Sequence, residues 1–317
     1  MKKLLFTIMA SMVFVFGLSS CDDKIPVAHM TMEITEPVDS KYTQPQKMIF
    51  EYNRYDDEEW IGVKYNYNET DEVVNISPQY GGYNVRYYYS NIFFTEDQEE
   101  RGFIKRNTTT KKMVFPDSME IIRDYAFLPF KNLEEIVIPK SIYDIDPIAF
   151  YKSSIKKITI DEESEFYEVK NDALYQKKEG HFVHYLNNPD LSQYAVYQAT
   201  DVLDYAFQNT NLTSIVFGEG VKRISGYALD DNANLTSITL PSTFEGFVES
   251  YSYATTFAIK DPETEEYIYK DDPRFNDLIA KRIIRIIKGD NPNLKTIYSH
   301  ANIDYDFTEF GIEYIKL

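Results

Sequence analysis

The sequence predicts an α/β solenoid, mostly β, in which short parallel strands stack between an N-terminal β-hairpin cap and a C-terminal cap containing a helix. One observation is a pattern of aliphatic residues within 133–160, in which Ile136 and Ile138 return one repeat later as Ile158 and Ile160. Another is an Ala-Phe pair that returns in the same register. A period of roughly 20–45 residues is typical of a solenoid, because a single unit buries its apolar face only by stacking on its neighbours.

The Ala-Phe pair marks the register of the repeats. It recurs, once as Ala-Leu, at four places: 126–127, 149–150, 206–207 and 228–229. The wide interval in the middle equals one repeat plus an insertion, which we place at about 161–193 within a repeat region of 109–247. A weaker last copy, NLKTI at 293–297, falls within a C-terminal cap of 248–317.

The repeat unit resembles the bacterial BspA-type leucine-rich repeat, whose pattern reads L-x-x-I-x-I-P-x-S-V-x-x-I-x-x-x-A-F. Residues 133–150, LEEIVIPKSIYDIDPIAF, follow this pattern, and 111–127 and 212–229 are further copies. The resemblance implies a leucine-rich repeat array. It also implies display at the cell surface, which is typical of that family.

The resemblance extends to two less regular segments. Residues 166–186 are similar to the family's strand-rich interruption, and 72–94 to its divergent first repeat. Just upstream, within 47–67, the runs KMIFEYNRY and EWIGVKYNY flank an acidic turn, and their alternation and aromatic residues predict a hairpin. We expect the region 47–108 to cap the open end of the core, because terminal repeats need a polar outer face.

The N-terminal residues carry the signals of an exported lipoprotein. Two lysines and a short apolar run precede LSSC, which resembles the lipobox of bacterial lipoproteins and ends at Cys21, the only cysteine. The apolar run is too short to span a membrane. We therefore expect a lipoprotein signal peptide at 1–20, followed by a lipidated Cys21 and a proline-containing tether at 21–46, in which alternation around 29–34 allows one short strand.

The acidic pair Asp22-Asp23 after the cysteine is compatible with two membranes. In some Gram-negative lineages acidic residues there accompany export to the outer face of the cell, whereas in others Asp keeps the lipoprotein on the inner membrane. The surface display that the resemblance implies favours a lipid-anchored, surface-exposed protein of the outer membrane.

The C-terminal cap is expected to contain a helix. Asp272 and Pro273 suit an N-cap and a first helical residue, apolar residues recur at helical spacing from Phe275 to Ile287, and Gly289 stands where the helix would stop. Basic residues gather near its C-terminal end. They favour a cap helix, because the macrodipole stabilises positive charge there, and a basic helix lying on a membrane surface is the alternative.

The sequence lacks the motifs of common enzymes and cofactor sites, including G-x-S-x-G, H-E-x-x-H, the Walker loop and G-x-G-x-x-G. We therefore expect a non-enzymatic protein with no catalytic residue, no cofactor and no metal. His181 and His184 form H-x-x-H, but side chains three apart on a strand point to opposite faces. Asp230, Asn232 and Asn234 begin a calcium-loop pattern, but an apolar residue follows where that loop needs Gly.

Composition and charge limit the partners. Five tyrosines within 80–89 would form a sugar-stacking platform if they were exposed together, but alternation along a strand predicts that about half lie in the core. An enzyme with an unrecognised carboxylate site is favoured only if the insertion and the array enclose a deep pocket. The net charge of −18 repels nucleic acid and anionic membranes, so we expect no nucleic acid partner and membrane contact through the lipid anchor only.

The repeat geometry predicts which residues face solvent. In each I-x-I unit the aliphatic residues turn inward, and the residue between them faces outward beside its counterpart in the next rung. Pairs of alternating sign precede three of the strands and form a candidate charge ladder: Lys111, Lys112, Glu134, Glu135, Lys156 and Lys157. Later rungs carry no charge there and form the candidate interaction face: Thr213, Ser214, Val216, Thr236, Ser237 and Thr239.

The sequence therefore predicts a lipid-anchored surface protein that mediates protein-protein interaction or adhesion. Carbohydrate binding by an accessory surface lipoprotein is the alternative, so the expected partner is an unknown protein or glycan at the cell surface. For the outward residues themselves, the alternative to binding is a solvated ladder that only sets the register of the strands.

Overall fold

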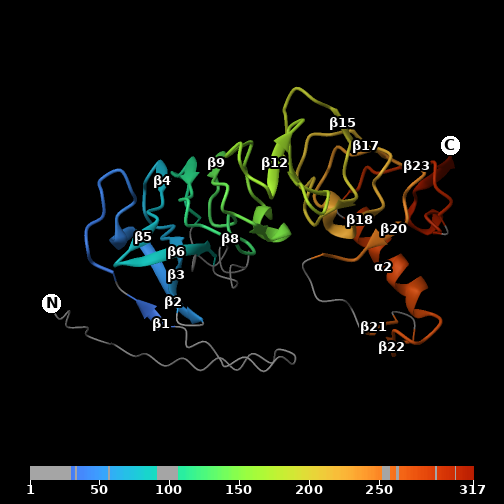
Figure 1. Cartoon of the computed structure of the whole chain (residues 1–317). Helices are drawn as coiled ribbons and strands as arrows, with labels where there is room; N and C mark the ends of the chain where they lie inside the picture. The colour runs from blue at the N-terminus through green and yellow to red at the C-terminus, as the bar shows by residue number, and fades with distance from the viewer. Residues whose placement is uncertain are drawn as a thin grey trace.

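The computed structural model describes residues 30–32, 34–55, 58–90, 106–251, 258–261, 264–289, 291–303 and 305–317. The expected signal peptide and Cys21 lie outside these residues. The described chain is an elongated stack of repeats that runs from an N-terminal hairpin to a C-terminal helix and a last pair of strands (Figure 1). Most of its elements are short strands paired in parallel, which confirms the predicted solenoid.

A first ladder of parallel strands runs along one side of the stack and carries the I-x-I units. Its N-terminal half consists of β4 (Val73–Asn75), β7 (Lys112–Val114), β9 (Glu135–Ile138) and β11 (Lys157–Ile160). Its C-terminal half consists of β15 (Gln193–Val196), β17 (Ser214–Phe217), β19 (Ser237–Leu240), β23 (Thr296–Ser299) and β24 (Glu313–Lys316). The strands pair in register, with Ile136 beside Met113 and Ile158, as the repeat period predicts.

A second ladder runs along the other side of the stack (Figure 1). Its N-terminal half contains β1 (Met30–Met32), β2 (Met48–Tyr55), β3 (Glu58–Tyr65), β6 (Tyr83–Tyr88), β8 (Ile121–Ile122) and β10 (Asp144–Ile145), with β5 (Gln79–Tyr80) on β6. Its C-terminal half contains β12 (Tyr167–Lys170), β13 (Ala173–Gln176), β14 (His181–Tyr185), β16 (Asp201–Val202), β18 (Arg223–Ser225) and β20 (Gly246–Val248). Outside the ladders are η1 (Pro45–Lys47), η2 (Pro147–Phe150), η3 (Gly226–Leu229), η4 (Thr308–Phe310), and the hairpin of β21 (Ala258–Lys260) and β22 (Tyr267–Tyr269).

Local sequence explains how the Ala-Phe pair reaches the core. The side chain of Asp146 accepts a hydrogen bond of 2.9 Å from the Ile148 N–H, and Pro147 occupies the first position of η2. A capping acid followed by proline starts a helical turn at low cost, because proline lacks the N–H that would go unpaired there. The turn carries Ala149-Phe150 inward, where both residues are at most 1% exposed.

The phenylalanines of the repeats are core residues, Phe127 and Phe150 in the N-terminal half and Phe207 in the C-terminal half. Phe127 and Phe207 are fully buried like Phe150, and the rings of Phe127 and Phe150 have centroids 5.3 Å apart. On the strands, Ile136 is fully buried whereas Val137 beside it is half-buried. The residues thus alternate between core and solvent along each rung, as the I-x-I pattern predicts.

The expected insertion forms an antiparallel sheet of β12, β13 and β14, which we call the insertion plate. Both of its faces are buried: Leu174 packs into the core of the N-terminal half, whereas Tyr175 and Phe182 pack into that of the C-terminal half. Neither ladder continues across the plate, because β11 is not paired with β15, nor β10 with β12. The plate therefore separates two hydrophobic cores.

The N-terminal end carries the predicted hairpin. β2 and β3 pair in antiparallel fashion, with Phe50 opposite Val63, and both of these side chains are buried. β3 then pairs in parallel with β6, so the hairpin closes the end of the second ladder. β1 adds to its outer edge, at the place where alternation allows a short strand.

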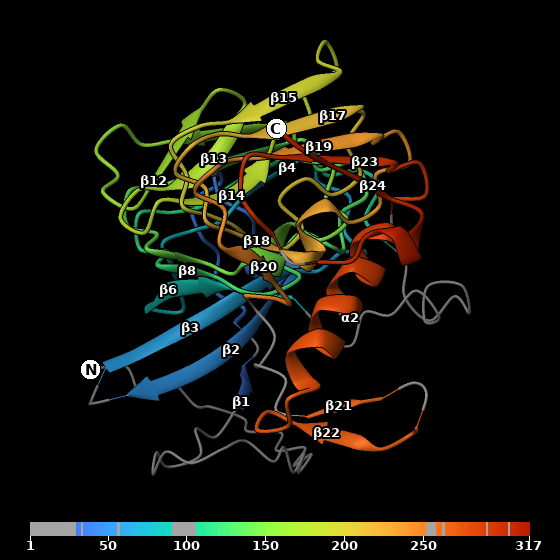
Figure 2. The same ribbon diagram turned by 90° about the vertical axis from the view of Figure 1, so that its right-hand side faces the viewer.

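The predicted C-terminal helix is α2 (Phe275–Gly289), which begins two residues later than expected. The Asp272 carboxylate accepts a hydrogen bond of 2.8 Å from the Arg274 N–H, so Asp272 and Pro273 form a turn ahead of the helix. Ile283, Ile284 and Ile287 are buried where α2 packs against η3 and β20 (Figure 2). Because protein already covers these apolar residues, the structure favours the cap over the membrane-surface helix.

Candidate functional site

The C-terminal half of the first ladder presents a broad surface, which we call the five-strand face. It consists of the outward side chains of β15, β17, β19, β23 and β24. Strand register arranges them in two columns: Gln193, Ser214, Ser237, Thr296 and Glu313, and beside them Ala195, Val216, Thr239, Tyr298 and Ile315. With strands about 4.8 Å apart, each column spans roughly 19 Å. Glu313 is the one charged member of the set.

The structure brings four of the six candidate interaction residues together on this face, as Ser214, Ser237, Val216 and Thr239. Val216 is the most open of them, at 39% exposed. Thr213 and Thr236 have a different role. Their hydroxyls donate hydrogen bonds of 2.9 Å to the carbonyls of Ser192 and Thr213, so they link each rung to the one before it.

Sequence reasoning missed part of this face. β15 has Tyr194 and Val196 in the inward places, and the aromatic residue departs from the I-x-I pattern although it is also buried. Tyr197 follows at 58% exposed. Its ring lies over Gly218, where an added Cβ would stand 3.0 Å from the ring and 2.7 Å from the Val196 carbonyl oxygen. A Y-x-V unit followed by tyrosine is the signal that would have revealed the extra rung.

The N-terminal half of the same ladder is charged, and its charges are paired across rungs. Glu135 lies between two lysines, with Oε1 at 2.8 Å from Lys112 Nζ and 3.3 Å from Lys157 Nζ. Glu134 contacts Lys156 at 2.8 Å. The hydrogen bond from Lys112 is the main reason that the pKa of Glu135 is lowered below its ordinary value. The geometry matches the expected alternation of sign from rung to rung.

Lys111 departs from the expected arrangement. Its ammonium contacts Glu72 Oε1 at 2.7 Å instead of forming an ion pair with Glu134. Glu72 directly precedes β4, the rung before the three that the charge ladder was predicted to contain. The ladder therefore extends one rung further toward the N-terminus, and each of its charges is balanced by a neighbour.

The tyrosine-rich segment does not form a sugar-stacking platform. Tyr80 and Tyr88 are each 1% exposed, and Tyr87 is 6% exposed. The Tyr80 hydroxyl donates a hydrogen bond of 2.9 Å to the Thr43 carbonyl, and burial raises the pKa of Tyr80 to about 12. Three of the five tyrosines are buried and the other two are half-buried, so the five are not exposed together. The condition under which it would favour carbohydrate binding is therefore not met.

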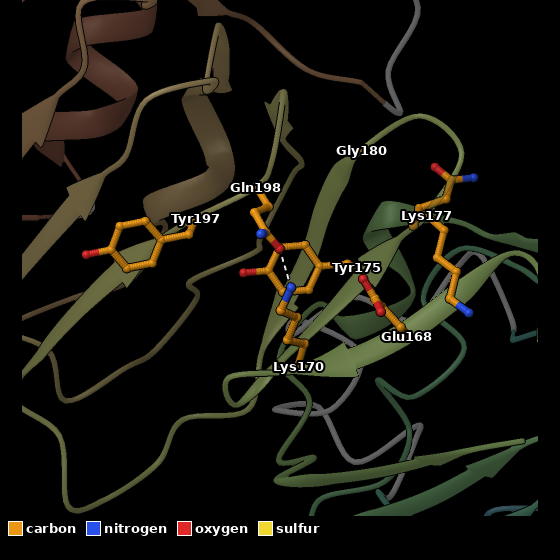
Figure 3. Close-up of a pocket in the computed structure, with 8 residues that line it drawn as sticks. Glu168, Lys170, Tyr175, Lys177, Gly180, Tyr197 and Gln198 are labelled. Carbon is orange, nitrogen blue, oxygen red and sulfur yellow. Dashed lines mark hydrogen bonds between the residues drawn. The ribbon is translucent and has the colours of Figure 1, made fainter. Parts of the chain in front are cut away.

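A small pocket lies where the insertion plate meets the next repeat (Figure 3). Its volume is about 40 Å³, and Glu168 is the one acidic residue that lines it. Lys170 Nζ donates to the Gln198 amide oxygen across it, and Tyr197 points away from the other side chains (Figure 3). A pocket this small with a single carboxylate is unsuited to glycoside hydrolysis, which typically uses a pair of carboxylates.

The two histidines of H-x-x-H do not converge. His181 Nε2 lies 3.6 Å from an oxygen of Asp201, which is 3% exposed. His184 is buried against Phe150 on the other side of the strand. Burial lowers the pKa of both histidines, to about 4 for His184. In the ranges that the structure describes, no cluster of three His, Cys, Asp or Glu side chains is placed to hold a metal ion.

Asn232, from the calcium-loop pattern, is a fully buried structural amide. Its Nδ2 donates to the carbonyls of Phe207 and Leu229 at 2.7 and 2.8 Å, and its Oδ1 accepts from Thr210. These bonds satisfy backbone groups that the turn between rungs leaves unpaired. Among the described helices, none has the length and apolar character needed to cross a bilayer.

The repeat unit matches the profile of a known family. The profile of the BspA type Leucine rich repeat region matches residues 101–200 and 200–270, with six copies. A leucine-rich repeat protein of known structure from Eubacterium ventriosum ATCC 27560 is 13% identical, with a TM-score of 0.43, over 92% of this chain and 85% of that one. The pneumococcal vaccine antigen PcpA is 13% identical, with a TM-score of 0.40, over 86% of this chain and 83% of that one. No curated protein sequence matches the chain.

The matched residues span more than half of the chain and include the rungs from β7 to β20. BspA-type proteins are associated with the surface of bacteria, and leucine-rich repeat proteins generally bind other proteins. The repeat register, the two ladders and the profile match all lead to one conclusion. The chain belongs to the BspA-type leucine-rich repeat family.

Proposed function

We propose that the protein is a lipid-anchored, non-enzymatic protein of the outer membrane surface that binds another protein through the five-strand face. The observation that carries this proposal is the lack of charge on that face. In a chain of net charge −18, two columns spanning roughly 19 Å include one acidic residue. The cores of protein interfaces are likewise depleted in charged residues and enriched in aromatic residues. Tyr298 supplies an aromatic residue to the five-strand face.

The N-terminal half of the ladder is less suited to a partner. A ligand covering Glu135 would have to desolvate it together with Lys112 and Lys157, and desolvating an ion pair costs more than desolvating hydroxyls or methyl groups. On the five-strand face, Val216 and Thr239 offer methyl groups, and Ser214 and Ser237 offer hydroxyls. Binding at these four residues removes apolar area from water and buries no charged group without a partner.

A lipid anchor at Cys21 would fit the same role, because acylation would hold the chain at the membrane. Ile34 and Thr43, within the expected tether of 21–46, are buried against the first repeats, so we propose that only the residues before β1 act as a spacer. The alternative, carbohydrate binding on the tyrosine-rich segment, has less support because Tyr80, Tyr87 and Tyr88 are buried.

The test is a binding screen with the soluble chain from Asp22 against extracellular matrix proteins, beside a glycan array. For any protein that binds, Val216→Arg with Thr239→Arg is expected to weaken binding at least about tenfold, because two cations would be buried unpaired. Val137→Arg is the matched control, since Val137 occupies the same outward position in the charged half. Equal loss in the control, or no loss in the double variant, would place the binding surface elsewhere.

A further inference from the structure

A second site lies on the other ladder and in the other half of the stack. It is a cavity of about 260 Å³ on the outer side of β3, β6, β8 and β10. Its aromatic lining consists of Trp60, Tyr87 and Tyr143, and its charged lining of two arginines and two glutamates. Trp60 is the only tryptophan of the chain. The cavity is separate from the five-strand face and is independent of the function proposed for it.

The wall formed by Tyr87 is held in place before any ligand arrives. Its ring occupies the space beside Gly62, where an added Cβ would stand 2.0 Å from the ring. Its hydroxyl donates to Glu51 at 2.9 Å and accepts from Asn53 Nδ2 at 2.6 Å. The ring of Trp60 packs edge-on against it, with centroids 4.9 Å apart and planes at 81°. Glycine at 62 is thus required for the aromatic wall.

Arg86 clamps one side of the cavity. It is the extra residue of a β-bulge, because Ile61 pairs with Val85 whereas the next residue pairs with Tyr87. Its guanidinium donates two hydrogen bonds to the Glu120 carboxylate, at 2.9 and 2.8 Å, and one to Glu58 at 2.9 Å. Arg86 therefore orients the two carboxylates, and their remaining lone pairs can accept hydrogen bonds from a ligand.

Arg123 is the cation left for a ligand. It is exposed, and its guanidinium carbon lies 5.8 Å from the centroid of Tyr87. The positive charge of Arg123 opposes the rise that burial causes in the pKa of nearby Asp144. Arg123 nevertheless forms no ion pair with any residue within the described ranges. In a protein with an excess of acidic residues, an arginine without an ion pair beside an aromatic wall is suited to a bidentate carboxylate.

We propose that this cavity binds one saccharide residue that carries a carboxylate, such as a uronic acid unit of an extracellular polysaccharide. The apolar face of the sugar ring packs on Tyr143, which is 44% exposed, and on the part of the Trp60 ring that Arg86 leaves uncovered, since the Arg86 guanidinium carbon lies 5.4 Å from the Trp60 centroid. The ring hydroxyls donate to Glu58 and Glu120, and the carboxylate of the sugar pairs with Arg123. The cavity is smaller than the roughly 300–1,000 Å³ of sites for drug-sized molecules, as a site for one sugar unit should be.

The single tryptophan makes the proposal directly testable. Intrinsic tryptophan fluorescence of the purified full-length chain reports on this cavity, because Trp60 is its only source. An oligosaccharide containing glucuronic acid is expected to change the emission in a saturable way. The same oligosaccharide with its carboxyl groups reduced should bind about tenfold more weakly, because it cannot pair with Arg123.

Two variants complete the experiment. Arg123→Gln should bind the acidic oligosaccharide no better than the reduced one, whereas Arg285→Gln, at an exposed arginine on α2, should behave like the unaltered chain. Absence of a saturable emission change, or equal affinity for both saccharides, overturns the proposal. Saturable binding of a glutamate-rich peptide in place of the saccharide also overturns it and assigns the cavity to an acidic peptide.

Discussion

The imidazole of His184 lies face to face with the ring of Phe150, with centroids 4.4 Å apart and planes inclined by 11°. His184 comes from the insertion plate and Phe150 from the repeat before it, so this stack fastens the plate to the N-terminal core. His184 is 6% exposed, and its Nδ1 has no hydrogen-bond partner within the described structure. The imidazole must therefore stay neutral to remain in place.

Phe150→Ala is expected to cost about 3–5 kcal/mol of unfolding free energy, because it removes a buried ring and leaves a cavity beside Phe127 and His184. In a stack coupled mainly between neighbours the damage stays local. Hydrogen exchange should show the amides of Ile136 and Ile158 losing protection first. Uniform loss along the chain would indicate one cooperative unit.

Phe217→Ala supplies the reciprocal control. Phe217 is 1% exposed and packs in the C-terminal core, beyond the insertion plate. Its loss should weaken protection at Ile215 and Ile238 first and spare Ile136. If both variants weaken the same amides, the plate does not separate the two cores energetically.

The buried His184 predicts a loss of stability in mild acid. Its pKa is lowered from 6.5 to about 4 by burial, so between these values the unfolded state binds a proton that the folded state does not. Stability therefore falls as pH drops below about 6.5, by about 2 kcal/mol at pH 5. Denaturant unfolding of His184→Met at several pH values should lack this component, while a pH dependence identical to that of the unaltered chain would contradict it.

Charge reversal tests the ladder. Glu134→Lys with Glu135→Lys would place three lysine-bearing rungs side by side, and we expect a loss on the order of 1–2 kcal/mol that shrinks as salt is added. Glu135→Gln alone should cost more than Glu134→Gln, because Glu135 contacts two lysines and Glu134 contacts one. Salt-independent losses would mean that these ion pairs do not form in solution.

Lipid attachment is tested at Cys21. Cys21→Ala is expected to leave an unacylated protein that retains its N-terminal segment, because processing at a lipobox requires the cysteine. Growth with labelled fatty acid, followed by isolation of the protein, measures the modification. Label in the variant equal to that in the unaltered chain would rule out the lipoprotein interpretation.

Much of the fold could be predicted because each repeat buries apolar residues at equivalent positions. Ile136 and Ile158 occupy equivalent places, so one pattern predicts both. The rung of Tyr194 departs from the pattern, since the core accepts an aromatic ring where the repeat has an aliphatic residue. The start of α2 also shifted, because Asp272 satisfies the Arg274 N–H in a turn ahead of the helix.

The cavity beside Trp60 could not be predicted from the sequence. It depends on a bulge that turns Arg86 outward and on Tyr87 lying over Gly62, and neither leaves a periodic signal. Its residues lie on β3, β6 and β8 or directly beside β8 and β10, and their proximity follows from the register of the second ladder. The periodicity of the repeats predicts which residues form the core. The shape of this outer surface depends instead on local departures from the repeat, such as the bulge at Arg86.

The insertion plate makes the two halves of the molecule independent in length. Since no strand pairs across it, a repeat gained or lost on one side leaves the register of the other side unchanged. Each repeat gained or lost on the N-terminal side would move the five-strand face by one rung, about 4.8 Å, relative to the N-terminal end of the stack. Evolution or design can therefore adjust the reach of the protein from the membrane in fixed steps without rebuilding the surface at its far end.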